Sequence, residues 1–129
     1  MFIRIRLFVS SVSIAILLGL GLGLASVAEV NAAGYMSKAQ KIAAGKVLSY
    51  ARKKGNCLGC HVMDDGELPG NIGPPLVGMK ARYPDKAKLR QQIYDATMAN
   101  INTIMPPFGR HRILTVKELD LVTEYIYSL

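Results

Sequence analysis

The sequence contains little cysteine, and this scarcity limits the kinds of site that it can build. Cys57 and Cys60 are the only cysteines among 129 residues, and the histidines are His61 and His111. A zinc ribbon would need a second pair of thiol ligands, and none is present. Since both cysteines belong to a single motif, none remains for a disulfide bond or for a free thiol nucleophile.

Other chemical groups are missing as well. No pair of carboxylates and no nucleophile beside a base stands out, so the sequence indicates no complete catalytic site. The formal charge is +7. The basic residues are scattered and no aromatic residues alternate with them, which argues against nucleic acid as a partner. A basic surface of this kind suits acidic proteins or anionic substrates.

The two cysteines lie in a C-x-x-C-H motif that ends at His61. Two thiols about one helical turn apart can each form a thioether with a haem vinyl group, and the histidine that follows can bind the iron. A redox dithiol of the thioredoxin type would lie in a βαβ context, which the sequence does not show. We therefore predict one covalently bound haem c, attached through Cys57 and Cys60, with His61 as an axial ligand of the iron.

The N-terminal segment has the pattern of a secretory signal. Two arginines lie within the first six residues, residues 7–28 carry no charge, and residues 30–32 match the small–x–small pattern of a signal-peptidase site. We predict a signal peptide over residues 1–32 and a cytochrome c domain over residues 33–129, located in the periplasm. An uncleaved membrane anchor is the alternative, because the apolar run is just long enough to span a bilayer.

Helix-start signals divide the rest of the chain. A capping box of the S-x-x-Q type predicts a helix over residues 37–52, and a T-x-x-E box predicts one over residues 115–129. Apolar residues at helical spacing predict another helix over residues 84–98. Proline and glycine are frequent between them, which indicates loops. We expect an all-α fold of three to four helices, in which the last helix packs across the first and long loops line the haem.

The loop over residues 100–112 contains the best candidate for the second axial ligand. Met105 precedes two prolines, so its backbone is held extended in a stiff loop. A ligand directly after the haem motif cannot reach the opposite face of the ring, and methionines in or beside predicted helices usually fill core space. We therefore predict Met105 as the sixth ligand, a choice that raises the reduction potential. The candidates set aside are Met63, Met79, Met98 and His111.

The last three residues of this loop raise a separate question. His111 would give a bis-histidine haem, but it lies between Arg110 and Arg112 and is expected to be exposed. These three residues are candidates for a rim that docks a partner. A solvated loop tip is an equally good interpretation.

Residues 71–76 form a second rigid loop of sequence N-I-G-P-P-L. A histidine that ligates haem normally donates its second ring N–H to a backbone carbonyl, which fixes the orientation of the ring. A Gly-Pro-Pro loop would hold such a carbonyl still. Composition alone would favour a plain surface turn.

Three blocks of sequence resemble a known family. They are G-N-C-L-G-C-H over residues 55–61, G-N-I-G-P-P-L over residues 70–76 and M-P-P-F-G-R-H over residues 105–111. Their order resembles class I cytochromes c over the whole predicted mature chain. Together they look like the SoxX family, the c-type cytochrome subunits of sulfur oxidation. The resemblance implies that the Pro74 carbonyl accepts a hydrogen bond from His61 and that Met105 is the sixth ligand.

The resemblance to SoxX also implies partners and an activity. The expected complex is a heterodimer with a second haem-bearing subunit, SoxA-like, which couples thiosulfate to a cysteine of a SoxYZ-like carrier protein. This chain would be the electron-transfer subunit of that L-cysteine S-thiosulfotransferase and would pass electrons to a downstream acceptor. It would carry no complete active site of its own.

Two other functions are compatible with the residues alone. The first is a free periplasmic class I cytochrome c that shuttles electrons to a terminal oxidase. The second is a membrane-tethered cytochrome, which requires that the N-terminal apolar run be retained. Only the resemblance to SoxX favours the enzyme subunit over the shuttle.

Overall fold

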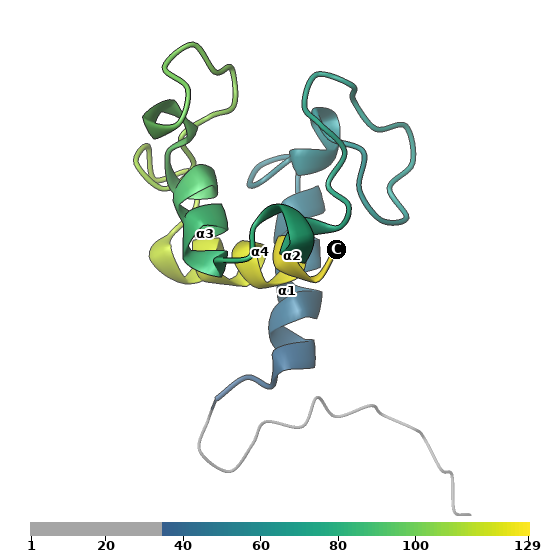
Figure 1. Ribbon diagram of the computed structural model, residues 1–129. Coiled ribbons are helices and arrows are strands. Elements are labelled where there is room, and N and C mark those ends of the chain that lie inside the picture. The colour runs from purple at the N-terminus through teal and green to yellow at the C-terminus, as the bar shows by residue number, and fades with distance from the viewer. Residues whose placement is uncertain (1–34) are drawn as a thin grey trace, which may run out of the picture.

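The computed structural model describes residues 35–129, and every regular element in that range is a helix (Figure 1). The all-α prediction is therefore confirmed. The predicted signal peptide over residues 1–32 lies outside the described residues, and no helix found within residues 35–129 is long and apolar enough to cross a bilayer. The elements in chain order are α1 (Lys38–Tyr50), η1 (Cys57–Gly59), α2 (Met79–Arg82), α3 (Lys86–Tyr94), η2 (Ala96–Met98) and α4 (Val116–Ser128).

Both predicted capping boxes start helices. At α1 the Gln40 amide donates to Ser37 Oγ at 3.2 Å, and the Ser37 amide donates to Gln40 Oε1 at 2.7 Å. At α4 the Glu118 amide donates to Thr115 Oγ1 at 3.2 Å, and the Thr115 amide donates to Glu118 Oε2 at 2.9 Å. Each box satisfies backbone donors that the first turn of a helix leaves without partners.

The predicted helix over residues 84–98 is two helices rather than one. α3 ends at Tyr94, Asp95 adopts extended backbone with φ −155°, and η2 follows. The Asp95 carboxylate accepts hydrogen bonds from the Thr97 amide at 3.1 Å and the Thr97 hydroxyl at 2.6 Å. A side chain that caps a new segment in this way competes with continuation of the helix. Met98 was predicted to fill core space, and this is wrong, because its side chain is 70% exposed.

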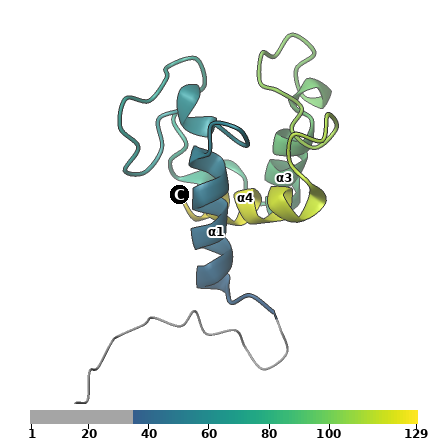
Figure 2. The same cartoon turned by 180° about the vertical axis from the view of Figure 1, so that it is seen from behind.

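α1 crosses α4 at close range (Figures 1 and 2). The contact depends on Gly45, which is buried. A Cβ atom at this position would overlap the carbonyl oxygen of Leu121 in α4 and crowd the Tyr125 Cβ. Since glycine in a helix interior costs about 1 kcal/mol relative to alanine, its place here is explained by the backbone approach that it allows. The expected packing of the last helix across the first is confirmed.

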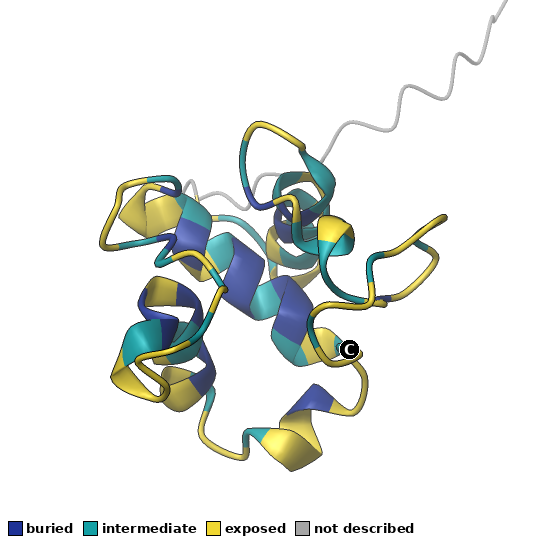
Figure 3. Ribbon diagram, turned by 90° about the horizontal axis from the view of Figure 1, so that it is seen from above, coloured by how far each residue is buried: buried dark blue, intermediate teal, exposed yellow. Residues whose placement is uncertain are grey.

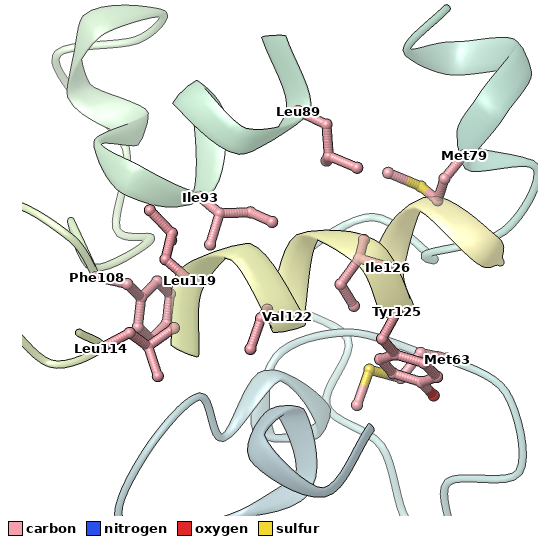
Figure 4. Packing of buried hydrophobic residues seen from close by; sticks show 10 residues of the cluster. All are labelled: Met63, Met79, Leu89, Ile93, Phe108, Leu114, Leu119, Val122, Tyr125 and Ile126. Atoms are coloured by element: carbon pink, nitrogen blue, oxygen red, sulfur yellow. The ribbon is translucent and has the colours of Figure 1, made fainter. Parts of the chain in front are cut away.

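The inward face of α4 forms the centre of the core. Figure 3 shows buried residues gathered along this helix, which runs through the middle of the molecule. Leu89 and Ile93 of α3 pack above it, and Met63 and Tyr125 lie together below it (Figure 4). Met79 is 1% exposed, as predicted for a methionine that fills core space. The full cluster is Met63, Met79, Leu89, Ile93, Phe108, Leu114, Leu119, Val122, Tyr125 and Ile126.

Two arms of the chain rise on opposite sides of α4 (Figures 1 and 2). One arm contains residues 51–78 with the C-x-x-C-H motif, and the other contains α3, η2 and the loop that leads to α4. Ion pairs tie both arms to α4. Lys54 pairs with Glu118 at 2.7 Å, Lys86 with Glu124 at 2.5 Å and Arg90 with Asp120 at 2.6 Å.

We predict that Gly45→Ala destabilises the protein. The new Cβ has no space against the Leu121 carbonyl, so the helices must separate, at a cost of about 1–3 kcal/mol. Chemical denaturation of the haem-loaded protein measures the change. Ala43→Gly, at an exposed position of the same helix, is the matched control and should cost only its helix propensity, about 1 kcal/mol. A Gly45→Ala variant as stable as the wild type, or more stable, would contradict the close crossing.

Candidate haem site

The C-x-x-C-H motif folds into a tight turn at the base of one arm. η1 begins after Asn56, whose backbone is left-handed with φ 46°. The amides of Cys60 and His61 both donate to the Cys57 carbonyl, at 3.1 and 2.9 Å. This turn brings the two thiols and the imidazole to the wall of one cavity, as the motif predicts.

The cavity lies between the two arms and above α4, and its volume is about 410 Å³. Most of its lining is apolar. Its floor includes Val122 and Ile126 of α4. Its lining also includes Met105, which belongs to the loop between η2 and α4 and so to the arm without the cysteines. Two thiols, an imidazole and a thioether around an apolar cavity form the donor set that a c-type haem requires, so the residues present fit this group.

The imidazole of His61 is held in one orientation. Its Nδ1 lies 2.7 Å from the Pro74 carbonyl oxygen, a hydrogen bond when Nδ1 carries the proton. The other ring nitrogen, Nε2, is then unprotonated and able to bind a metal. Two backbone hydrogen bonds of 2.8 Å flank Pro74, from the Gly73 amide to Cys60 and from the Leu76 amide to Val62.

Two glycines let the proline loop approach the motif. A Cβ atom at Gly73 would overlap the His61 imidazole, and one at Gly70 would overlap the Gly59 carbonyl. The composition of this segment predicted a loop, and the resemblance to SoxX implied the contact between its Pro74 carbonyl and His61. The close packing of Gly73 on the imidazole was not predicted. Arg82 supports the far end of the loop, because its Nη1 donates to the Pro75 carbonyl at 2.6 Å.

A polar cluster that the sequence analysis missed holds the segment after the motif. Lys46 of α1 pairs with both Asp64 and Asp65 at 2.8 Å. The Tyr125 hydroxyl of α4 donates to Asp64 at 3.2 Å, and the Tyr50 hydroxyl donates to Asp65 at 3.0 Å. The hydrogen bonds from Lys46 and Tyr50 lower the pKa of the Asp65 carboxyl. The cluster therefore ties the chain beyond the motif to both central helices.

Burial is the main influence on the pKa of the Cys57 thiol. It raises the pKa of the Cys57 thiol to about 11, against an opposing hydrogen bond with Ser49. An unattached Cys57 is therefore neutral at pH 7. This matches the apolar character of the cavity and gives no sign of an activated thiolate.

The candidate axial ligands occupy different surroundings. Met105 is partly buried and packs beside the core, and Phe108, 8% exposed, anchors its loop. Met79 also lines the cavity, but its sulfur accepts a hydrogen bond from Arg82 at 3.4 Å and it is otherwise enclosed by the core. Met63 is buried away from the cavity lining, and His111 is exposed.

Within the candidate docking rim, Nη1 of Arg110 lies 3.0 Å from the buried carboxylate of Asp95, and about half of the Arg110 side chain is exposed. The docking role of the rim stays a prediction. His111 and Arg112 remain exposed. Over the described range, residues 35–129, no cluster of three or more histidine, cysteine, aspartate or glutamate side chains is suited to a separate metal ion.

Comparisons with known proteins support a cytochrome c fold with a bound haem c. Residues 40–126 match the family described as cytochrome c oxidase, cbb3-type, subunit III. A chain in the crystal structure of SoxXA from P. pantotrophus superposes with a TM-score of 0.60 and 27% identity, over 67% of this chain and 79% of that one. An uncharacterised lipoprotein of Aquifex aeolicus (strain VF5) is 34% identical over 77 residues, 59% of this chain. The aligned segment spans 37% of that relative's length.

We predict that Gly73→Ala disturbs the histidine. The added methyl group would overlap the imidazole, so either the ring or the proline loop must move, at about 1–3 kcal/mol. For a domain of this size the thermal midpoint of the haem-loaded protein should fall by roughly 5 °C or more. Asn71→Ala, at an exposed position of the same loop, is the control and should leave the midpoint unchanged. Equal midpoints for the two variants would refute the close packing.

Proposed function

This chain belongs to the family of cytochromes c described as cbb3-type cytochrome c oxidase subunit III, and from that premise we propose that it is the electron-transfer subunit of a thiosulfate-oxidising complex. The likeness to a chain of SoxXA carries the proposal, because it covers 79% of that chain. The family match identifies the cofactor as a covalently bound haem c. Cys57 and Cys60 provide its attachment motif. When bound, the haem iron supplies a one-electron couple between its ferric and ferrous states.

Our proposal assigns the axial positions to His61 and Met105. The hydrogen bond between His61 and the Pro74 carbonyl supports the first assignment, because it leaves Nε2 free to bind. The position of Met105 in the loop between η2 and α4, in the lining of the same cavity, supports the second. A thioether opposite an imidazole, in apolar surroundings, favours the reduced state and raises the potential.

These residues hold an electron carrier rather than a site of bond formation. If His61 and Met105 both hold the iron, no position there would be open to a substrate, and with both cysteines attached to haem neither would be free to carry sulfur. We therefore assign the sulfur chemistry to a SoxA-like partner subunit or to its interface with this chain. The full assembly is a heterodimeric L-cysteine S-thiosulfotransferase.

The reaction of the assembly sets the number of electrons that this chain must accept. Joining the terminal sulfur of thiosulfate to the thiol of a SoxYZ-like carrier forms one S–S bond and releases one proton and two electrons. Because a haem c held by this chain would supply a one-electron couple, the chain would pass each electron to a downstream acceptor before it accepts the next. The protein is exported to the periplasm in this proposal. A lipoprotein among its relatives and the predicted signal over residues 1–32 support export.

One observation favours a second function. The description of the matched family names a terminal oxidase subunit, which suits the alternative of a free shuttle that delivers electrons to an oxidase. Such a shuttle would work as a monomer and would need neither thiosulfate nor a carrier protein.

We predict that Met105→Ala removes the sixth ligand. The ferric protein should lose its methionine-to-iron charge-transfer band, and its reduction potential should fall by on the order of 0.1 V or more. Visible spectroscopy and redox titration measure both effects. Met98→Ala is the matched control, because Met98 is 70% exposed on η2. A band that persists in Met105→Ala would show that another residue is the ligand.

The function itself is tested by reconstitution. We expect the haem-loaded chain to co-purify with a second haem-bearing subunit and to be reduced by thiosulfate only when that subunit and the carrier protein are both present. Stopped-flow absorbance of the haem follows the reduction. A monomer that stays oxidised with all components, yet reduces a terminal oxidase, would leave only the shuttle.

A further inference from the structure

The Met105 loop is closed at its base by the chain on either side of it. The amides of Gly109 and Arg110 both donate to the Tyr94 carbonyl, at 3.0 and 3.3 Å. Gly109 also packs directly on the ring of Tyr94, because a Cβ atom there would overlap it. The last residue of α3 therefore contacts the segment that follows Met105, and the loop between them forms a compact closed unit.

A buried ion pair lies at the same base. Asp95, directly after α3, is 4% exposed. One of its carboxylate oxygens accepts two hydrogen bonds from Thr97, at 3.1 and 2.6 Å, and the other lies 3.0 Å from Nη1 of Arg110. The hydrogen bonds from Thr97 and the charge of Arg110 lower the pKa of the Asp95 carboxyl. Asp95 therefore joins η2 on one side to the end of the Met105 loop on the other.

We propose that Asp95 and Arg110 form a clamp that closes the base of the Met105 loop and keeps Met105 at the cavity. They are positioning residues, since neither lines the cavity. The part of this inference that concerns the iron rests on the proposed assignment of Met105 as ligand. The part that concerns the loop rests on the contacts alone.

The two members of the clamp contribute unequally. Arg110 is half exposed, with 51% of its side chain accessible, whereas 5% of the Asp95 side chain is accessible. If Arg110 loses its charge, the closed loop retains a buried carboxylate without a cation, which is strongly unfavourable. Opening the loop would hydrate that carboxylate, so the loss of Arg110 favours opening. If Asp95 becomes a neutral amide, no buried charge is left, and the effect is smaller.

Because the two residues contribute unequally, the clamp predicts a characteristic order of amide exchange rates among three variants. We compare Arg110→Leu, Asp95→Asn and the double variant in the haem-loaded protein by hydrogen exchange of amides 100–112. Arg110→Leu should raise exchange in this loop by about tenfold or more. Asp95→Asn should raise it less. The double variant should match Asp95→Asn within about threefold, because removing the carboxylate relieves most of the cost of losing Arg110.

A second readout follows the iron ligand. The rate at which added imidazole replaces the native ligand of the ferric haem should rise in Arg110→Leu by a similar factor. Arg112→Leu is the matched control. Arg112 is an exposed cation of the same loop, and within residues 35–129 it forms no ion pair, in contrast to Arg110. It should stay within twofold of the wild type in both measurements. Arg110→Lys, which keeps a charge near Asp95, should restore part of the protection.

The two readouts separate this inference from the ligand assignment. Unchanged amide exchange in Arg110→Leu, or equal changes in Arg112→Leu, overturns the clamp whichever residue binds the iron. Faster amide exchange together with an unchanged imidazole rate supports the clamp as a loop closure but overturns its effect on the ligand. If Asp95→Asn fails to fold, the clamp can still be tested with the three arginine variants, Arg110→Leu, Arg110→Lys and Arg112→Leu.

Discussion

The close approach of α1 and α4 at Gly45 is the contact on which the rest of the structure depends. α1 leads directly into the C-x-x-C-H arm, and α4 forms the floor of the cavity. Their crossing therefore fixes the height and direction of the arm above the floor. Lys46 and Tyr50, on the same helix as Gly45, extend this control beyond the motif through Asp64 and Asp65.

The cavity between the arms explains why so small a domain needs a cofactor. A chain of this size buries too little apolar surface to be more than marginally stable, and here a cavity lined by apolar side chains borders the hydrophobic core along α4. A covalently attached porphyrin fills such a space and joins the two arms. Each arm also closes on itself, one through the backbone bonds around Pro74 and the other through the pairing of Asp95 with Arg110.

Local signals in the sequence predicted well and long-range contacts did not. The capping boxes at Ser37 and Thr115 depend on side chains three residues apart, so the helix starts could be read directly. The predicted helix over residues 84–98 was not divided at Asp95, because the apolar spacing continues past the point where the Asp95 carboxylate caps Thr97. The pairing of the same carboxylate with Arg110 joins separate segments and had no local signal. The polar cluster around Asp64 was not predicted either, because its partners Lys46 and Tyr125 are distant in the sequence. At the site, the haem motif is local, whereas Met105 had to be chosen among several methionines by the rigidity of its loop.

The central proposal is that this chain holds a single haem c between an imidazole and a thioether. The most direct test is a near-infrared magnetic circular dichroism spectrum of the ferric holoprotein, because the position of the low-energy charge-transfer band depends on the pair of axial ligands. We expect the signature of a low-spin iron with histidine and methionine. The signature of two histidines, or of a high-spin iron with an open position, would contradict the account.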